Sequence, residues 1–331
     1  MSGAFVISLD FELMWGVRDH RSIRDYGDAI LGGRDAIPEI LSRFEKAGIN
    51  ATWATVGLLF AENREEMLEF APKIRPNYEN AELSPYVSIE SKQIGRNERE
   101  DPLHFGLSLI ERISDTPGQE IATHTYSHYY CLEQGQAIES FEADLRASVE
   151  IGNAKGYAVQ SLVFPRNQTN YPLAIKAADL GIDIYRGEDD GWLRKPRSGA
   201  QTTQLFRLVR FLDDALPVAP SKTTNAKQNG PAIDIPATQF LRPWSKRLSL
   251  YNKLHIRKIQ AEMIAAAKTG GLYHLWWHPH NFGRNTDINL AQLDAILKTY
   301  IHCRDEYGME SHSMQSLALK LRSSTTEKTA Q

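Results

Sequence analysis

Short apolar segments rich in β-branched and aromatic residues alternate along the chain with longer segments whose apolar residues recur every three or four positions. The short segments predict β-strands over residues 4–10, 50–57, 119–125, 161–166, 183–187 and 271–278. The longer segments predict α-helices over residues 35–47, 102–113, 138–154, 171–180, 248–268 and 289–307. Strand and helix alternate, which indicates an α/β fold with a mainly parallel sheet or barrel covered by helices.

Two segments interrupt this alternation. Residues 72–101 carry prolines, asparagines and mixed charges, and residues 194–238 include the polar run PSKTTNAKQNGPA. Both are predicted to be insertions or long loops over one face of the barrel. Because no linker-like stretch divides the chain, we expect a single domain over residues 1–322, followed by a disordered tail at 323–331 that has nothing to bury.

The composition narrows the class of partner. Hydrophobic residues make up 42% of the chain, which is an ordinary value for a globular protein. The formal net charge is −3 and there is no basic block, so the chain is not expected to bind nucleic acid. Cys131 and Cys303 are the only cysteines, which excludes a disulfide framework and a thiolate metal cluster. The first residues lack the pattern of a secretion signal, and no apolar run approaches the roughly 20 residues of a membrane span. The sequence therefore predicts a cytoplasmic protein without stable membrane insertion that acts on a small or neutral molecule.

Reactive side chains follow the carboxyl ends of the predicted strands and not their starts. In a β/α barrel these ends open on one face, so residues far apart in the sequence would meet there. The sequence therefore predicts one functional site at the face where the carboxyl ends of the strands open. Its candidate residues are Asp10, Glu12, His124, His128, Arg166 and His278.

Asp10 and Glu12 lie two positions apart at the end of the first strand, so the strand period sends both carboxylates toward the same side. One acid could hold a metal ion while the other moves a proton. The alternative is structural, since the two acids could cap the next loop or pair with Arg18.

His124 and His128 are spaced four apart at a turn that is predicted to begin a helix, which would stack the two imidazoles on one face. Together with a carboxylate they form a ligand set typical of a catalytic zinc or a related divalent ion, with positions left for water and substrate.

Arginine and histidine complete the set. Arg166 follows the apolar run SLVFP, where a guanidinium could orient a neighbouring carboxylate, although a surface arginine is the alternative. In LYHLWWHPHNFG, His278 precedes the proline that stops the strand and is best placed at the mouth of the barrel. His274 lies deeper and is interpreted as a core or supporting residue, and His280 as a loop residue.

At these positions the chain resembles the NodB-type polysaccharide deacetylases, carbohydrate esterase family four. The segment SLDFE resembles the first motif of that family, HTYSH the second, FPRNQTN the third and LWWHPHN the last. The resemblance covers nearly the whole chain outside the two insertions and implies a distorted (β/α) barrel.

The resemblance also implies roles for the first two motifs. Asp10 would be the general base and Glu12 a metal ligand, with His124 and His128 as the other ligands. The family usually has two adjacent aspartates here, and the spacing Asp10-Phe11-Glu12 leaves open which acid has which role.

In the later motifs, Arg166 would hold the base and His278 would be the general acid. A backbone N–H near Asn167 would stabilise the oxyanion. The segment GEDDGW has the acid and tryptophan with which the family tethers its last histidine, but at a different spacing, with Asp190 as the acid.

These roles imply a metal-dependent carbohydrate N-deacetylase, with Zn²⁺ as the expected metal. The segments Trp15-Gly16 and PRNQ resemble those of a family branch that is associated with bacterial surface polysaccharide. This resemblance implies that the substrate is a small-molecule, lipid-linked or nucleotide-linked sugar precursor. The alternatives are an amidohydrolase of cyclic amides or ureides and a sugar-binding relative without catalysis. A groove lined by Trp15, Trp53 and Trp277 would favour sugar rings, whereas a small closed polar cavity would favour a ureide. The acyl group and homo-oligomerisation stay open.

Overall fold

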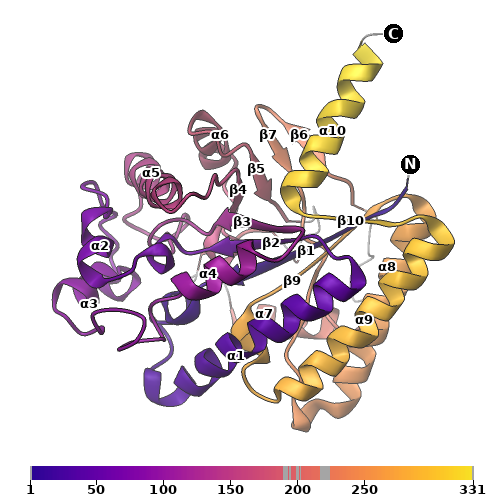
Figure 1. Cartoon of the computed structure of the whole chain (residues 1–331), viewed down its shortest axis with the longest axis horizontal. Helices are drawn as coiled ribbons and strands as arrows, with labels where there is room; N and C mark the ends of the chain where they lie inside the picture. The colour runs from indigo at the N-terminus through magenta and orange to yellow at the C-terminus, as the bar shows by residue number, and fades with distance from the viewer. Residues whose placement is uncertain are drawn as a thin grey trace.

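The structure is a computed structural model that describes residues 2–188, 193, 195–198, 201, 203–216 and 224–329, with the backbone alone from residue 325 onward. Its centre is a ten-stranded sheet surrounded by helices (Figure 1). The strand order is β6-β7-β5-β4-β3-β2-β1-β9-β8, and β10 pairs with the start of β1. All neighbouring strands run parallel except β6 and β7. The sheet curls into a partial barrel, which confirms the predicted α/β fold of distorted (β/α) barrel type.

The strands are β1 (Ala4–Phe11), β2 (Ala51–Thr55), β3 (Gln119–Thr123), β4 (Ser161–Val163), β5 (Ile184–Arg186), β6 (Lys227–Asn229), β7 (Ala232–Asp234), β8 (Gln239–Phe240), β9 (Leu272–Trp277) and β10 (Glu310–His312). The α-helices are α1 (Ile23–Ala47), α2 (Arg64–Glu69), α3 (Tyr86–Glu90), α4 (Leu107–Ser114), α5 (Ile138–Ala154), α6 (Tyr171–Asp179), α7 (Gln204–Asp213), α8 (Ser249–Thr269), α9 (Thr286–Tyr307) and α10 (Met314–Thr329). Short 3₁₀ turns follow several strands, among them η1 (Leu13–Gly16), η4 (Pro165–Asn167) and η6 (Pro279–Phe282).

The register aligns the carboxyl ends of the central strands at one edge of the sheet. Phe11 at the end of β1 lies opposite Thr55, and Thr55 lies opposite Thr123. Val163 ends β4 opposite Arg186, which ends β5. The residues that follow these ends therefore meet at one mouth of the barrel, as the sequence predicts.

The two faces of the sheet are filled differently. The larger core packs the outer face of β1, β2 and β9 against α1, α4, α8 and α9. On the inner face a smaller core closes the amino-terminal ends of the strands, where Met314, Leu317 and Ala318 of α10 meet Val6 and Ile233. The inner face therefore has an apolar floor, and its polar residues are left for the opposite end.

Several elements differ from the sequence-based boundaries. Helix α1 begins at Ile23, 12 residues before the predicted start, because Ser22 and Asp25 form a capping box. The predicted insertion at 194–238 contains α7, β6 and β7, and α2 precedes the predicted insertion at 72–101, which contains α3. Helix α10 continues to Thr329 through residues that the sequence predicts to be an unstructured tail. Among the described residues no helix is both long and apolar enough to cross a membrane.

Helix α1 packs unusually closely on the turn that follows β9. A Cβ atom added to Gly33 would lie 2.6 Å from the Cα of His280, and one added to Gly32 would lie 2.1 Å from the carbonyl oxygen of Gly283. Backbone atoms cannot move aside as a flexible side chain can. The paired glycines thus fix the position of η6, which begins directly after His278.

We expect Gly33→Ala to lower the free energy of unfolding by about 1–3 kcal/mol, because the new methyl overpacks against the backbone of η6. Gly27→Ala in the same helix is the matched control, since its nearest new contact is the Ile23 side chain at 3.3 Å. That control should be neutral or slightly stabilising because alanine favours a helix. Urea denaturation of both variants measures the difference, and equal stabilities would contradict the close packing of α1 on η6.

Candidate metal and acid–base site

Glu12, His124 and His128 converge at the mouth of the barrel and are all buried. Glu12 Oε2 lies 3.1 Å from His128 Nε2 and 3.5 Å from His124 Nε2. Four ligands arranged tetrahedrally about 2.1 Å from a zinc ion would be roughly 3.4 Å apart. The separations of these three groups therefore suit a single small divalent cation.

The local backbone places the Glu12 carboxylate over a glycine. Glu12 follows β1 directly, and Leu13 then takes a left-handed conformation (φ 46°) that starts η1. A Cβ atom on Gly16 would lie 1.9 Å from the carboxyl carbon of Glu12. Only glycine leaves room at this position for the carboxylate to reach the two imidazoles.

The two histidines lie on an irregular turn after β3 and not at a helix start, which corrects the prediction. Thr125 and His128 both have left-handed backbones, with φ of 64° and 58°. Asp144, buried in α5, accepts hydrogen bonds from the backbone N–H groups of Tyr126 (2.8 Å) and Ser127 (3.3 Å). The turn therefore brings the imidazoles together, and a carboxylate from the next helix holds it in shape.

The protonation of this trio fits a metal. His124 Nδ1 lies 2.8 Å from the carbonyl oxygen of Val163, which can only accept, so Nδ1 carries a hydrogen and Nε2 is the ring nitrogen that faces Glu12. That Nε2 is buried without a hydrogen-bond partner. Burial lowers the pKa of His128 to about 4 and keeps it neutral. Burial raises the pKa of Glu12, but the neighbouring His278, His124 and His128 more than offset this, and it lies well below its usual value. One carboxylate and two imidazoles form the donor set of a divalent metal site.

Asp10 is held by Arg186, a residue that the sequence pattern does not single out. Arg186 donates two parallel hydrogen bonds to Asp10, from Nη1 to Oδ1 (2.6 Å) and from Nη2 to Oδ2 (2.8 Å). The guanidinium also donates to Asn167 Oδ1 (2.6 Å) and lies 4.4 Å from the ring centroid of Trp276. Burial raises the pKa of Asp10, but the charge of Arg186 and, next in size, the effect of His124 lower it by more. The pKa therefore lies below its usual value, and the carboxyl is ionised. Arg186 ends an apolar strand segment, the signal by which Arg166 is selected.

Behind this ion pair lies a buried polar chain. Arg186 Nη1 donates to Ser8 Oγ at 3.0 Å, and Ser8 Oγ lies 2.8 Å from His274 Nε2. His274 Nδ1 lies 3.2 Å from the carbonyl oxygen of Ile235. His274 thus has the supporting position that the sequence predicts, one step behind the guanidinium.

Arg166 does not contact Asp10, and the predicted contact is wrong. Its guanidinium pairs with Asp19 and lies 4.4 Å from the ring centroid of Tyr130. The left-handed conformation of Arg166 (φ 55°) in η4 turns its side chain toward Asp19. The neighbouring Asn167 is the residue of this turn that reaches Arg186. The Asn167 N–H donates to the carbonyl of Phe164 (2.9 Å), so it is already used within the turn.

His278 faces both acids across the mouth. Its Nε2 lies 3.7 Å from Asp10 Oδ2 and 3.7 Å from Glu12 Oε1, and its side chain is 23% exposed. It is the most exposed of these groups, which suits a group that meets substrate. The predicted loop residue His280 lies in η6, buried against the His278 ring at 5.0 Å between centroids.

The predicted tryptophan groove is absent. Trp15, Trp53 and Trp277 are each 0% exposed. The Trp53 indole donates to Gln119 Oε1 (3.0 Å), and Trp277 packs against Phe44 and Phe282 in the outer core. The aromatic rings beside His278 are instead those of Trp276 and Phe240, at 5.7 and 5.9 Å between centroids. Both are partly exposed.

Two further residues with reactive side chains lie outside the trio. Cys131 is buried and burial raises the pKa of its thiol well above its usual value, so it lacks the character of a nucleophile. Asp190, the acid predicted to tether the last histidine, lies outside the described residues.

Comparison with known proteins agrees with this architecture. No family model matches the sequence, and no curated protein matches it significantly. Among solved structures, a putative polysaccharide deacetylase from Mycobacterium smegmatis superposes with a TM-score of 0.61 at 13% identity, covering 98% of this chain and 92% of that one. The PuuE allantoinase gives a TM-score of 0.54 at 11% identity, covering 95% and 88%. A GH57-type branching enzyme from Pyrococcus horikoshii also gives 0.54 at 11% identity, covering 97% and 71%.

At these identities the comparisons establish the fold alone. The three proteins are named for different reactions, so the fold does not select the chemistry. The chain thus has the fold found in a putative polysaccharide deacetylase, and its chemistry depends on Glu12, His124, His128 and their surroundings.

We expect His124→Ala or His128→Ala to reduce the metal bound per chain to a small fraction of wild type, because each removes one of three protein ligands. His302→Ala, at an exposed position in α9, is the control and should keep its metal. Elemental analysis of protein purified without chelator measures the ratio. Full occupancy in both ligand variants would contradict the site, provided that thermal unfolding shows both to be folded.

Proposed function

We propose that this protein is a metal-dependent hydrolase that removes an N-acyl group, most simply N-acetyl, from a sugar or sugar precursor of bacterial surface polysaccharide. The observation that carries the proposal is the meeting of two differently held carboxylates at one mouth. Glu12 faces His124 and His128, whereas Asp10 faces Arg186. His278 lies within 3.7 Å of both acids. A ligand set, a candidate base and a candidate acid therefore surround one point.

Glu12, His124 and His128 would hold the cation, with Zn²⁺ the expected ion. When bound, a divalent cation supplies electrophilic polarisation of the amide carbonyl and acidifies a water molecule. No serine or cysteine nucleophile is required.

The remaining steps belong to the protein's own side chains. Asp10 takes the proton of the attacking water, for which it must be ionised and correctly oriented, and its bidentate pair with Arg186 meets both needs. His278 then gives a proton to the nitrogen as the C–N bond breaks. The products are a carboxylate and a free amine on the sugar, so water is the only co-reactant.

Partly exposed aromatic rings beside the candidate acid support a sugar substrate. Trp276 and Phe240, whose ring centroids are 4.6 Å apart, line a small cavity of about 100 Å³ together with Arg242 and Glu188. Aromatic faces stack on sugar rings, and the charged groups can hydrogen-bond to hydroxyls. A substrate screen that includes N-acetylated sugars and a cyclic ureide tests this choice, because release of a sugar amine supports the proposal and ring opening of the ureide alone would refute it.

The two acids should respond differently to amide substitution. Asp10→Asn should keep the metal and lower turnover by about 10²–10⁴, because an amide fits the position but cannot accept the proton of water. Glu12→Gln should weaken metal binding, and its activity should partly return with added zinc, because loss of a ligand is a mass-action defect. Metal content and rate against added zinc separate the two cases. The reverse pattern would show that the acids have exchanged roles.

The two arginines give a second contrast. Arg186→Lys should lower turnover strongly, because lysine keeps the charge but cannot make the paired hydrogen bonds to Asp10. Arg166→Lys should have a much smaller effect on the catalytic rate, because Arg166 contacts Asp19 and not the acids. Steady-state kinetics of the two variants, each checked for folding by thermal unfolding, measure this. A larger loss in Arg166→Lys would restore the sequence-based assignment.

A further inference from the structure

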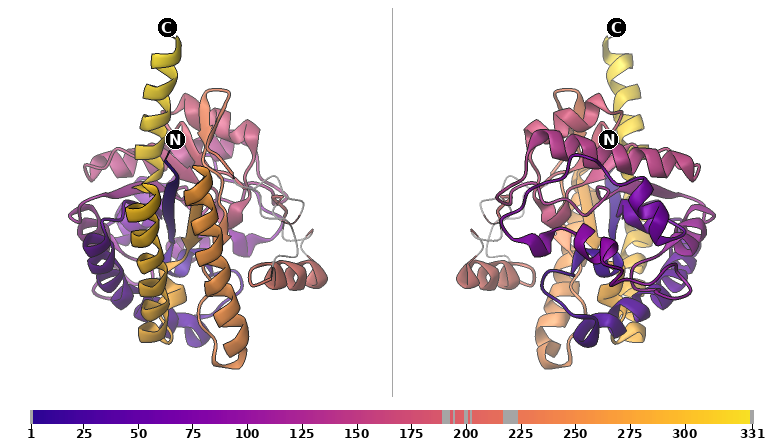
Figure 2. Two further views of the ribbon diagram at one scale, coloured as in Figure 1. Left: turned by 90° about the vertical axis from the view of Figure 1, so that its right-hand side faces the viewer. Right: turned by 90° about the vertical axis from the view of Figure 1, so that its left-hand side faces the viewer.

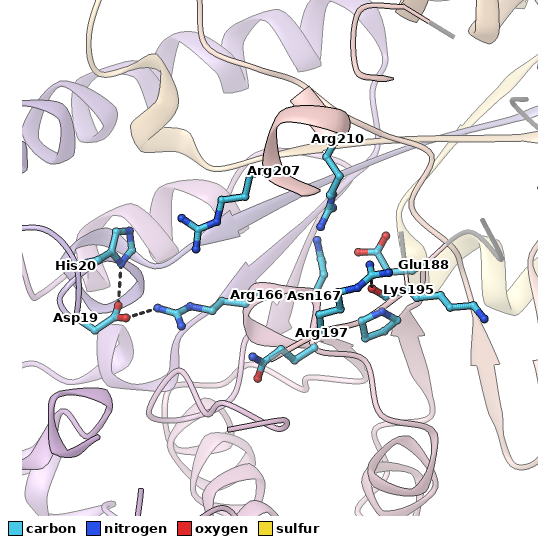
Figure 3. A pocket seen from close by; sticks show the side chains of 11 residues that line it. Asp19, His20, Arg166, Asn167, Glu188, Lys195, Arg197, Arg207 and Arg210 are labelled. Atoms are coloured by element: carbon cyan, nitrogen blue, oxygen red, sulfur yellow. Dashed lines mark hydrogen bonds and ion pairs between the residues drawn. The ribbon is translucent and has the colours of Figure 1, made fainter. Parts of the chain in front are cut away.

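A second, larger cavity of about 470 Å³ adjoins the candidate site (Figure 3). Its wall includes Asn167, whose side chain accepts a hydrogen bond from the same guanidinium that holds Asp10. It also shares Glu188 and Arg210 with the small cavity at Trp276 and Phe240. A substrate that reaches His278 along the aromatic rings can therefore extend into this larger cavity, which we call the cationic cavity.

Most of the described charged side chains that line the cationic cavity are positive. Its cationic groups come from separate parts of the chain: Arg166 from η4, Lys195 and Arg197 from the segment between β5 and α7, and Arg207 and Arg210 from α7. Figure 3 shows Arg207 and Arg210 reaching from α7 toward the side of the cavity that carries Arg166 and Asn167. Among the described residues that line the cavity, the carboxylates are Asp19 and Glu188, so five cationic side chains accompany two carboxylates.

The arginines of α7 differ from Arg166 in their surroundings. Asp19 contacts Arg166 and lies 2.9 Å from His20 Nδ1. Within the described part of the chain, neither Arg207 nor Arg210 forms an ion pair. Like charges brought together in this way repel one another unless an anion lies between them. A chain with a net charge of −3 has therefore gathered positive charge at one cavity beside its candidate site.

We propose that the cationic cavity binds the phosphate or diphosphate group of an activated sugar while the sugar lies at Trp276 and His278. A single carboxylate needs only one bidentate arginine, whereas a phosphate presents more oxygens and up to two charges to several donors. The arrangement of Arg166, Arg197, Arg207 and Arg210 from three segments matches that greater demand. This inference rests on the proposed function and narrows its substrate to a sugar joined to a phosphate-bearing carrier.

The carrier could be a nucleotide or a lipid, and α7 gives a reason to test both. Its arginines line the cavity, while Leu205 and Leu208 on another side of the helix are 70% and 52% exposed. Figure 2 shows α7 at the margin of the molecule, apart from the other helices. Exposed leucines beside a phosphate site would suit an acyl or prenyl chain, whereas a nucleotide would leave them unused.

The test measures binding of inorganic pyrophosphate to the whole protein by calorimetry. Wild type should bind, and the double variant Arg207→Gln/Arg210→Gln should raise Kd at least about tenfold, because each guanidinium contributes charge-assisted hydrogen bonds. The matched control is Arg24→Gln/Arg146→Gln, which removes two exposed arginines outside the cavity and should leave Kd unchanged. Equal Kd values for wild type and the α7 variant, or no binding to wild type, would overturn the inference. If pyrophosphate bound only through a metal ion, wild type and the α7 variant would also have equal Kd values, and the inference would likewise be overturned.

Titrations with UDP and with farnesyl diphosphate then distinguish the carriers. Preference for UDP supports a nucleotide-linked sugar, and preference for farnesyl diphosphate that weakens in Leu205→Gln/Leu208→Gln supports a lipid-linked sugar. Binding needs no turnover, so the two proposals fail separately. Arginine-dependent binding without amine release from any sugar contradicts the proposed function alone. Deacetylation of neutral sugars without anion binding contradicts the cationic cavity alone.

Discussion

Two carboxylates buried at the end of the central strand impose the main constraint on this structure. A charge removed from water is costly unless it is paired, and Asp10 and Glu12 are each about 3% exposed. The protein compensates the two charges by different means. A guanidinium covers Asp10 from β5, and imidazoles from the turn after β3, with His278 after β9, surround Glu12.

This difference follows from where each acid lies. Asp10 is still in β1 and faces the interior of the barrel, where an arginine at the end of another strand can donate two parallel hydrogen bonds to it. Glu12 follows the end of the strand. Its carboxylate can reach the turn of His124 and His128 because Leu13 has a left-handed backbone and Gly16 has no side chain. One acid is thereby held by a permanent cation, and the other faces the Nε2 atoms of two histidines. The first arrangement suits a base that must stay ionised, and the second suits a metal ligand.

The sequence identifies the site region because reactive residues follow strand ends, and parallel strands must bring those ends together. It cannot choose between Arg166 and Arg186 by that rule alone, since each follows or ends an apolar run. The choice depends on backbone conformation: Arg166 is left-handed in η4, whereas Arg186 is still in β5 with its side chain directed inward. Similarly, the long α1 is underestimated because its first turns contain Gly27, Gly32 and Gly33, which weaken the helical pattern. Those glycines are explained by close packing that no local pattern contains.

Strand parity separates the tryptophans near the site from those in the core better than aromatic character alone does. Register places Ser8 opposite Trp276 and Leu9 opposite Trp277. Ser8 shares the parity of Asp10, so Trp276 must lie on the face of the acids and Trp277 on the face covered by helices. The same period of two puts His274 and His278 on the inner face with Trp276. Strand parity counted from the acids therefore selects the ring that stacks on Arg186 and borders His278, and it assigns the other ring to the core against Phe44.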